Sequence, residues 1–273
     1  MGKETEPDMI QLVPLSREKL EKEGSYCYQN NPNSESCQRK NNWLSPELEK
    51  YISYAKVTGD GRLRGFIEFA ESYYFSRMVH ADLYMMIHCL WACPGDGYDS
   101  RLIRYCLEES ERLGKQGIAV VVHSGDSWTA YKDIFLNNGF KAVDKVPGGY
   151  ELLALKLHSN AYDPFFPCDW EEQLNRYKQL TLLRAFQCPY VQSITENVDK
   201  AASALHQISK DIADPINRNA LIPSSPTPYG VFGAACDGTP LSTHRLTVEA
   251  LVEQLKIYTS RERSLQANGS ERS

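Results

Sequence analysis

A glycine-rich stretch follows a long apolar segment of the chain. Residues 81–93 (ADLYMMIHCLWAC) predict a buried strand, and Gly95, Asp96 and Gly97 come directly before a helical pattern over 98–114. Such a loop presents unpaired N–H groups at the positive end of a helix dipole, and glycine lets a phosphate approach the backbone. The spacing allows a phosphate site, although most G-x-G sequences before a helix are plain loops. A Rossmann loop is excluded, because a third glycine and the acidic residue of the next strand are missing.

Two ionisable residues stand in strands that are otherwise apolar. Glu68 alternates with apolar neighbours in GFIEFA and therefore projects from the opposite face of its strand, and His88 lies within the apolar segment 81–93. Either group could take a proton as a general base. A solvated carboxylate and a hydrogen-bonded core histidine are the structural alternatives, and the sequence leaves both open.

A cysteine lies where a second strand pattern leads into a helix. Residues 179–186 are strand-like, Gln-Cys-Pro-Tyr follows at 187–190, and 191–208 has helical periodicity. A thiol at a helix N-terminus has a lowered pKa, which favours the thiolate of Cys188. Val191 stands where a dithiol oxidoreductase has its resolving cysteine, which excludes disulfide cycling within the motif. A reactive single thiol and a packing role both remain open.

The elements that must position these residues form an alternating pattern over the first part of the chain. The sequence Gly59-Asp60-Gly61 predicts a tight hairpin turn, and the Asn-rich residues 24–42 predict a long loop. The predicted strands cover residues 9–15, 51–58, 64–71, 81–93, 118–124 and 150–157, and the predicted helices cover 16–23, 98–114 and 128–139.

The rest of the chain predicts a smaller α/β unit. Residues 224–245 predict two strands joined by a turn at Asp237-Gly238, and 246–259 predict a closing helix. The fold class is therefore α/β in two domains. The predicted parts are residues 1–158, a linker over 159–177, a second domain over 178–259 and a disordered tail over 260–273.

Composition restricts the function classes. The 273 residues carry a net charge of −5, which argues against nucleic-acid binding. No run of 18 apolar residues predicts a membrane span, and the N-terminus lacks a secretory pattern, so we expect a cytoplasmic protein. The eight cysteines have no metal-ligand spacing, and we expect no metal. The oligomeric state stays open.

The first part of the chain resembles the Gcn5-related N-acetyltransferase (GNAT) superfamily. Gly95 and Gly97, the apolar pair Leu102-Ile103 and the segment 134–140 ending in Gly-Phe carry the resemblance. It implies a mixed central sheet flanked by helices and acetyl-CoA as co-substrate. The residues implied to contact the pantetheine arm and the pyrophosphate are Ile87, His88, Cys89, Gly95, Asp96, Gly97, Tyr98 and Ser100.

Some positions depart from the superfamily pattern. Cys93-Pro94 replaces the basic or amide residue before the first glycine, and Asp96 adds negative charge that Arg101 and Arg104 could compensate. Phe135 stands where the superfamily often has a general-acid tyrosine. Tyr131, one helical turn earlier, is therefore the candidate for returning a proton to the leaving thiolate.

The second part resembles the thioredoxin-like fold, with Cys188 in the nucleophile position and Pro228 in the position of the cis-proline. The order of the two parts, with Gln-Cys-Pro-Tyr at 187–190 and Pro-Thr-Pro-Tyr-Gly at 226–230, is similar to YoaP-type acetyltransferases.

The resemblance implies an acyl-CoA-dependent N-acyltransferase that acts on a small amine or amino-acid-like acceptor by direct transfer. Glu68 or His88 would assist deprotonation of the acceptor. Two alternatives remain. One is thiol-based chemistry or sulfur or metalloid binding at Cys188, and the other is a non-catalytic CoA-binding protein.

Overall fold

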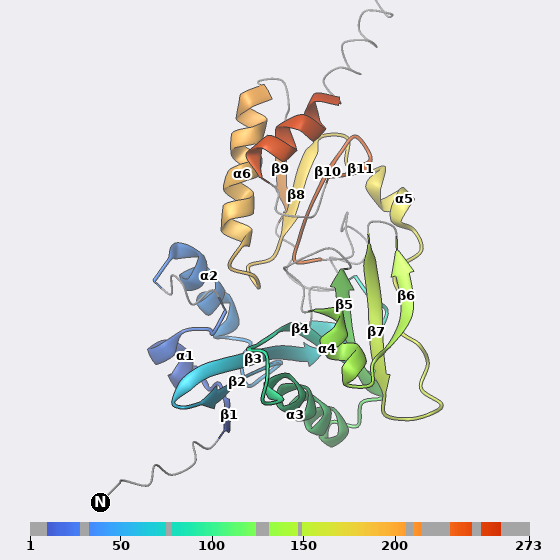
Figure 1. Ribbon diagram of the computed structural model, residues 1–273. Helices are drawn as coiled ribbons and strands as arrows, with labels where there is room; N and C mark the ends of the chain where they lie inside the picture. The colour runs from blue at the N-terminus through green and yellow to red at the C-terminus, as the bar shows by residue number, and fades with distance from the viewer. Residues whose placement is uncertain are drawn as a thin grey trace, which may run out of the picture. The chain divides into compact units, whose positions relative to one another are not determined.

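The computed structural model describes residues 10–27, 33–74, 78–123, 131–146, 149–205, 210–213, 230–241 and 247–257. The chain divides into two compact units (Figure 1). Unit 1 comprises Met1–Phe75 with Val79–Phe166, and unit 2 comprises Ser76–Met78 with Pro167–Ser273. Each unit is described by itself.

Unit 1 contains a seven-stranded sheet in the order β1-β2-β3-β4-β5-β7-β6. All neighbouring strands pair antiparallel except β4 and β5, which pair parallel. The expected mixed α/β fold, with a central sheet flanked by helices, is confirmed. The strands are β1 (Gln11–Pro14), β2 (Ile52–Gly59), β3 (Arg62–Glu71), β4 (Tyr84–Ala92), β5 (Gly117–His123), β6 (Lys141–Val146) and β7 (Tyr150–Lys156).

The predicted hairpin joins β2 and β3. Asp60 and Gly61 both have positive φ, 54° and 66°, as a two-residue turn of type I′ requires. Glycine adopts this backbone without strain, and aspartate is among the few other residues that tolerate it. The turn pairs Gly59 with Arg62, and a register shift between Val57 and Thr58 then sets the pairing of the rest of β3, the strand that carries Glu68.

Helix α1 (Arg17–Glu23) begins where it was predicted, with the Ser16 side chain accepting a hydrogen bond from the Lys19 N–H. The prediction of a loop over 24–42 is wrong, because α2 (Glu35–Leu44) occupies its second half with Ser34 as the N-cap. The buried face of α2 consists of Cys37, Lys40 and Leu44. A lysine in the buried stripe breaks the hydrophobic periodicity, and the sequence pattern therefore concealed this helix.

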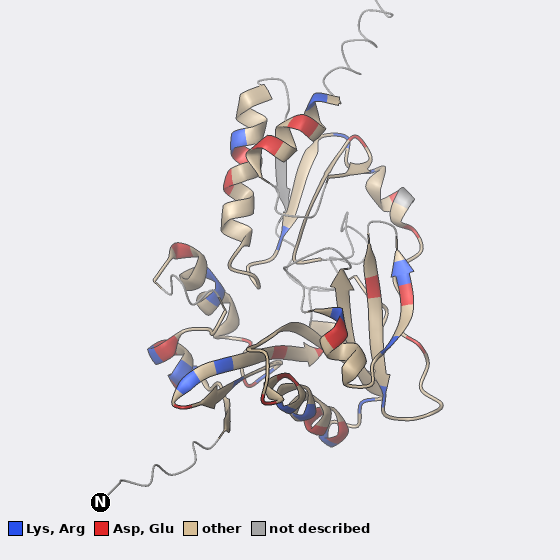
Figure 2. Cartoon of the chain, in the orientation of Figure 1, with Lys and Arg blue, Asp and Glu red and all other residues tan. Residues whose placement is uncertain are grey.

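Helix α3 (Tyr98–Arg112) covers one face of the sheet and contacts β2, β3, β4 and β5. Lys, Arg, Asp and Glu are spaced along α3, whereas β5 carries none of them (Figure 2). The strand residues beneath α3 are apolar and form the core with it; they are Ala55, Val57, Ile67, Phe69, Met85, Ile87, Leu90, Ile118, Val120, Val122 and Leu153. Burial of this apolar surface is the main source of stability for unit 1.

Strand β6 was not predicted from the sequence. It is one of the two edge strands of the sheet, and all of its side chains are exposed or only half-buried. The side chains of such an edge strand are largely exposed to solvent and need not be apolar. The hydrophobic periodicity from which strands are predicted is therefore missing. The short elements η1 (Ser72–Tyr74) and α4 (Lys132–Asn137) complete unit 1.

Unit 2 contains a four-stranded sheet in the order β11-β10-β8-β9. Strands β8 and β9 pair parallel and are connected through helix α6, and the other pairs are antiparallel. A further helix covers 248–257. The labelled elements are α5 (Trp170–Leu174), β8 (Leu180–Arg184), α6 (Val191–Leu205), β9 (Lys210–Ala213), β10 (Phe232–Cys236) and β11 (Thr239–Pro240).

The predicted hairpin of unit 2 is confirmed, with positive φ at Asp237 (47°) and Gly238 (70°) between β10 and β11. Helix α5 falls within the segment expected to be a linker. Across the described part of the chain, no helix combines the length and the apolar character that a membrane span requires.

Candidate active site

Strands β4 and β5 separate halfway along their length. Their pairing runs from Tyr84 opposite Gly117 to Ile87 opposite Val120, yet β4 continues to Ala92 and β5 to His123. In Figure 1, β5, β7 and β6 run together at a steep angle to β2, β3 and β4. Beyond Ile87, no described strand pairs with this edge of β4. Backbone N–H and C=O groups are therefore open to a ligand in the middle of the sheet.

A β-bulge occurs on β4 at the point where the two strands separate. Glu68 pairs with Cys89 and the next β3 residue, Phe69, pairs with Ile87, so His88 is the extra residue on β4. A bulge leaves one residue out of the ladder and turns its side chain away from the regular alternation. The structure thus brings His88 and Cys89, two of the residues singled out from the sequence, to the open edge.

The glycine loop follows the open end of β4. Gly95, Asp96 and Gly97 all have positive φ, at 93°, 56° and 64°. Gly97 is the N-cap of α3 and supplies no side-chain hydrogen bond, so the first N–H groups of the helix lack the usual cap partner. A Cβ atom added at Gly95 or Gly97 would meet no atom within 4 Å. The loop therefore presents accessible backbone donors that suit an anion.

The side chain of Asp96 is turned toward the helix that follows. Its Oδ2 accepts a hydrogen bond of 3.1 Å from the hydroxyl of Tyr98, whose ring is buried in the core under α3. Burial, followed by this hydrogen bond and the charge of Asp96, raises the pKa of Tyr98. The carboxylate of Asp96, the negative charge in the loop, thus accepts a hydrogen bond from the neutral hydroxyl of Tyr98.

The face of the sheet away from α3 carries titratable side chains in a row. Tyr54 of β2 lies directly opposite Glu68, and Glu68 lies directly opposite Cys89 of β4. Residues directly opposite one another in antiparallel strands project from the same face. Glu68 is therefore no solvated carboxylate, because its side chain is fully buried and pairs with Lys40 of α2.

The side chain of Lys40 of α2 contacts Glu68 and Tyr54 of this row. Its Nζ lies 2.5 Å from Oε2 of Glu68 and 5.7 Å from the centroid of the Tyr54 ring. Burial by itself would lower the pKa of Lys40, but the nearby Cys27 and Glu68 outweigh it, and the pKa is raised. The ammonium of Lys40 therefore stays charged. Sequence analysis missed Lys40, since its region was predicted to be a loop.

A second ionisable group missed from the sequence lies across the open edge from β4. His123 ends β5 and lies opposite Tyr150 of β7, with ring centroids 4.7 Å apart. His123 is 9% exposed. Strand alternation places it on the same face as Glu68 and away from α3. The histidine that ends the apolar run 118–122 was the signal that could have identified it.

The remaining candidates occupy separate places. Tyr131 directly precedes α4 and is 71% exposed, whereas Phe135 is fully buried against Phe140 in the core. Cys188 of unit 2 lies between β8 and α6, where its carbonyl accepts a hydrogen bond of 3.2 Å from the Val191 N–H. Pro228 lies outside the described residues.

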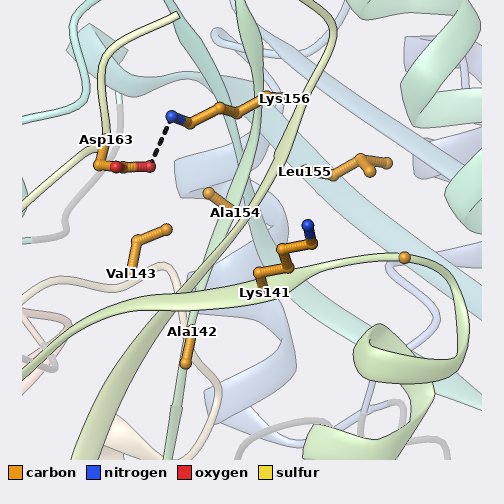
Figure 3. Close-up of a pocket in the computed structure, with 8 residues that line it drawn as sticks. Lys141, Ala142, Val143, Ala154, Leu155, Lys156 and Asp163 are labelled. Carbon is orange, nitrogen blue, oxygen red and sulfur yellow. Dashed lines mark ion pairs between the residues drawn. The ribbon is translucent and has the colours of Figure 1, made fainter. Parts of the chain in front are cut away.

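A cavity of about 570 Å³ lies along β6 and β7 (Figure 3). Figure 3 shows Lys156 paired with Asp163 at one side, a contact of 2.8 Å, and apolar Val143 and Ala154 between them and Lys141. Lys156 lies opposite Gly117, at the end of the strands where β4 and β5 are still paired. The cavity is thus remote from the open edge of β4. Among the described residues, no group of three or more His, Cys, Asp or Glu side chains could hold a metal ion.

Comparison with known proteins gives the following similarities. No protein-family model matches the chain. Over 157 residues the chain is 24% identical to "Uncharacterized N-acetyltransferase YoaP" of Bacillus subtilis (strain 168), a match that covers 55% of this chain and 61% of the relative. The chain thus spans about three fifths of the length of that curated relative.

Solved acetyltransferase structures align with a similar share of the chain. The putative acetyltransferase yncA from Salmonella typhimurium, solved with acetyl-CoA, is 14% identical and covers 56% of this chain and 96% of its own, with a TM-score of 0.42. The N-acetyltransferase PseH from Campylobacter jejuni, solved with acetyl coenzyme A, is 16% identical and covers 55% of this chain and 100% of its own, with a TM-score of 0.39.

Proposed function

We propose that unit 1 is a GNAT-type N-acetyltransferase that transfers the acetyl group of acetyl-CoA directly to a small amine or amino-acid-like acceptor. The observation that carries the proposal is the open edge of β4, which ends in the exposed glycine loop. One site thereby offers backbone partners for an extended ligand chain and, next to them, N–H donors for a phosphate. The similarity to a curated N-acetyltransferase over part of the chain supports the same assignment.

Residues that follow one another along the chain would bind successive parts of a CoA thioester. The N–H groups of residues 95–100 would hold the pyrophosphate, with Arg101 and Arg104 exposed on the first turns of α3 to supply positive charge. Ile87, His88 and Cys89 would offer backbone groups to the pantetheine arm, as one strand does to another. A CoA thioester held in this way would lie beside the bulge at His88.

The reaction itself requires proton transfers. The amine nitrogen of the acceptor attacks the thioester carbonyl carbon, the C–S bond breaks, and CoA leaves as the thiol after it gains a proton. A base must first remove a proton from the acceptor ammonium. Glu68 and His88 are our candidates, and His123 joins them from the other side of the open edge. Tyr131 remains the candidate for returning the proton to the thiolate.

We propose a thioredoxin-like fold for unit 2. The connectivity β8-α6-β9, followed by the β10-β11 hairpin and a final helix over 248–257, supports this assignment. Strand β9 supplies the second strand that was not evident in the sequence. We give Cys188 no part in acetyl transfer and expect Cys188→Ser to retain activity. We place the reaction in the cytoplasm, where the eight free cysteines would stay reduced.

Calorimetric titration of acetyl-CoA and CoA into the full chain tests the proposal. The wild type should bind acetyl-CoA with a micromolar Kd, and Gly97→Trp should abolish binding by filling the loop. Gly114→Trp is the matched control, since Gly114 lies beyond the other end of α3 with the same φ of 64° and equally open space. Both variants bear the same backbone strain, so only loss of the anion site separates them. No binding by the wild type at millimolar acetyl-CoA would reject the proposed function.

A further inference from the structure

The cavity along β6 and β7 lies entirely within unit 1, away from the open edge of β4. Its volume of about 570 Å³ is within the range of ordinary small-molecule sites. Figure 3 shows charged and apolar side chains around the same space, with the Lys156–Asp163 pair at one side and Lys141 at another. Acetyl transfer at the open edge makes no use of this cavity.

The segment that follows β7 supplies one wall of the cavity and is held in place by hydrogen bonds. The hydroxyl of Tyr84 donates a hydrogen bond of 2.6 Å to the carbonyl of Tyr162. Phe165 and His80 exchange two backbone hydrogen bonds, of 2.8 and 3.1 Å. Asp163 lies between these two attachments, so its carboxylate keeps a defined position at the cavity.

The charged groups that line the cavity do not balance. Nζ of Lys156 lies 2.8 Å from Oδ1 of Asp163, and this pair is neutral as a whole. Lys141 makes no ion pair or side-chain hydrogen bond with any residue that the structure describes. The carboxylate of Asp144, on the same strand, instead accepts hydrogen bonds of 2.8 Å from two backbone N–H groups. The cavity therefore has an excess of one positive charge.

The two lysines lie on one face of the sheet with apolar side chains beside them. Lys141 lies directly opposite Ala154, and Lys156 follows Ala154 by two positions on β7, so all three project from the same face. Diagonal neighbours of this kind are about 7–8 Å apart, which is within reach of long side chains. Val143, Ala154 and Leu155 add apolar surface to the same cavity.

We propose that this cavity binds a small monocarboxylate with an apolar body, which is an alkyl or aryl carboxylate. The carboxylate accepts charge-assisted hydrogen bonds from Lys141, and the apolar body packs against Val143 and Ala154. One negative charge balances the excess positive charge and leaves the Lys156–Asp163 pair intact. A dianion such as inorganic phosphate would bring a second charge beside Asp163 and would bury no apolar surface. This site is separate from the proposed acetyl transfer and does not depend on it.

The test is calorimetric titration of 3-phenylpropanoate and octanoate into the full chain. Each carboxylate is compared with its primary amide, which keeps the apolar body and loses the charge, and with acetate, which keeps the charge and loses the body. At least one carboxylate should bind with a Kd below about 1 mM, and its amide and acetate should each bind at least about tenfold more weakly. The proposal is overturned when neither carboxylate binds, or when the amide or acetate binds as tightly.

Exposed charges at the cavity can be changed without disturbing the core. Lys141→Met removes the excess charge and should weaken carboxylate binding by about tenfold. Lys145→Met is the matched control, because Lys145 is an exposed lysine of the same strand that does not line the cavity, and it should bind as the wild type does. Equal Kd values for the two variants would overturn the proposal.

Asp163→Asn provides a change of opposite sign. The carboxylate of Asp163 is exposed, and its loss leaves Lys156 as a second cation without a counter-charge. Carboxylate binding should therefore strengthen by about threefold. Weaker binding by Asp163→Asn than by the wild type would contradict the charge balance on which the proposal depends.

Gly97→Trp separates this cavity from the glycine loop, the other anion site of unit 1. The variant should lose acetyl-CoA and keep the carboxylate with the Kd of the wild type. Loss of both ligands would place the carboxylate at the loop and overturn the proposal. A wild type that binds the carboxylate with the expected selectivity but binds no acetyl-CoA supports the cavity site and contradicts only the proposed function.

Discussion

The two faces of the seven-stranded sheet are built from the same strands but carry different side chains. Toward α3, the strand residues of the core are all apolar. On the other face, alternate positions of the same strands place Tyr54, Glu68, Cys89, His123 and Tyr150. Because side chains alternate between faces, neighbouring residues such as Ile67 and Glu68 have opposite surroundings.

The two faces therefore contribute differently to stability and to chemistry. The α3 face buries apolar surface and holds the strands together, while the other face buries charge at a cost. Where β4 and β5 separate, the open edge of β4 gives a ligand access to the middle of the sheet. We therefore expect substitutions on the two faces to have different signatures, and the following predictions test that expectation.

The largest effect is expected from Lys40→Met. It leaves the buried carboxylate of Glu68 without its partner and should lower the free energy of unfolding by about 3–5 kcal/mol. The double variant Lys40→Met/Glu68→Leu removes both charges and should recover most of that loss. Urea denaturation measures both variants. A single variant that costs less than about 1 kcal/mol would mean that this face does not bury charge as described.

A substitution on the α3 face should affect stability without affecting ligand binding. Leu102 of α3 is fully buried in the core, and Leu102→Ala should lower the free energy of unfolding by about 2–5 kcal/mol. Leu113→Ala, at a residue 42% exposed, should cost less than about 0.5 kcal/mol. Calorimetry should find acetyl-CoA binding unchanged in both variants. Loss of binding in Leu102→Ala alone would show that the two faces are not separable.

The smallest effect concerns alkaline pH. Burial, with the charge of Asp163 and the nearby Tyr162, raises the pKa of Tyr84 from 10.0 to about 12. The folded protein thus keeps this proton to a higher pH than the unfolded chain does. The resulting stability is present below about pH 10 and is lost as the pH rises to about 12.

Stability measured from pH 9 to 12 should therefore fall less steeply in Tyr84→Phe than in the wild type. Tyr131→Phe, at a residue 71% exposed, serves as the control and should leave the slope unchanged. An identical slope in Tyr84→Phe and the wild type would contradict the assignment.

Local signals predicted much of the fold. The hairpin at Asp60-Gly61, the helix predicted over 16–23 and the helix after Gly97 all depend on residues close together in sequence, and the structure contains each of them. Prediction failed where the pattern was weak. Helix α2 buries Lys40 in its apolar stripe, which interrupts the helical periodicity. The edge strand β6 buries too few apolar side chains to show the alternation of a strand.

In the candidate site too, some features were predictable from the sequence and others were not. The glycine loop was predictable, because glycines before a helix are visible in the sequence. Glu68 and His88 were identified as ionisable residues within apolar strands, but their surroundings were not. The ion pair of Glu68 joins residues 28 positions apart, and the contact of His123 with Tyr150 joins residues from two strands.

The sequence by itself determined most of the strands and helices, where the tight turns fall, and which residues can carry charge. Only the tertiary structure decided that β4 and β5 part after Ile87 and that Lys40 meets Glu68 beside Tyr54. Turns and periodicity follow from the conformational limits of neighbouring residues. Strand separation and buried pairing follow from contacts between distant residues, which form only once the whole sheet and its helices have packed.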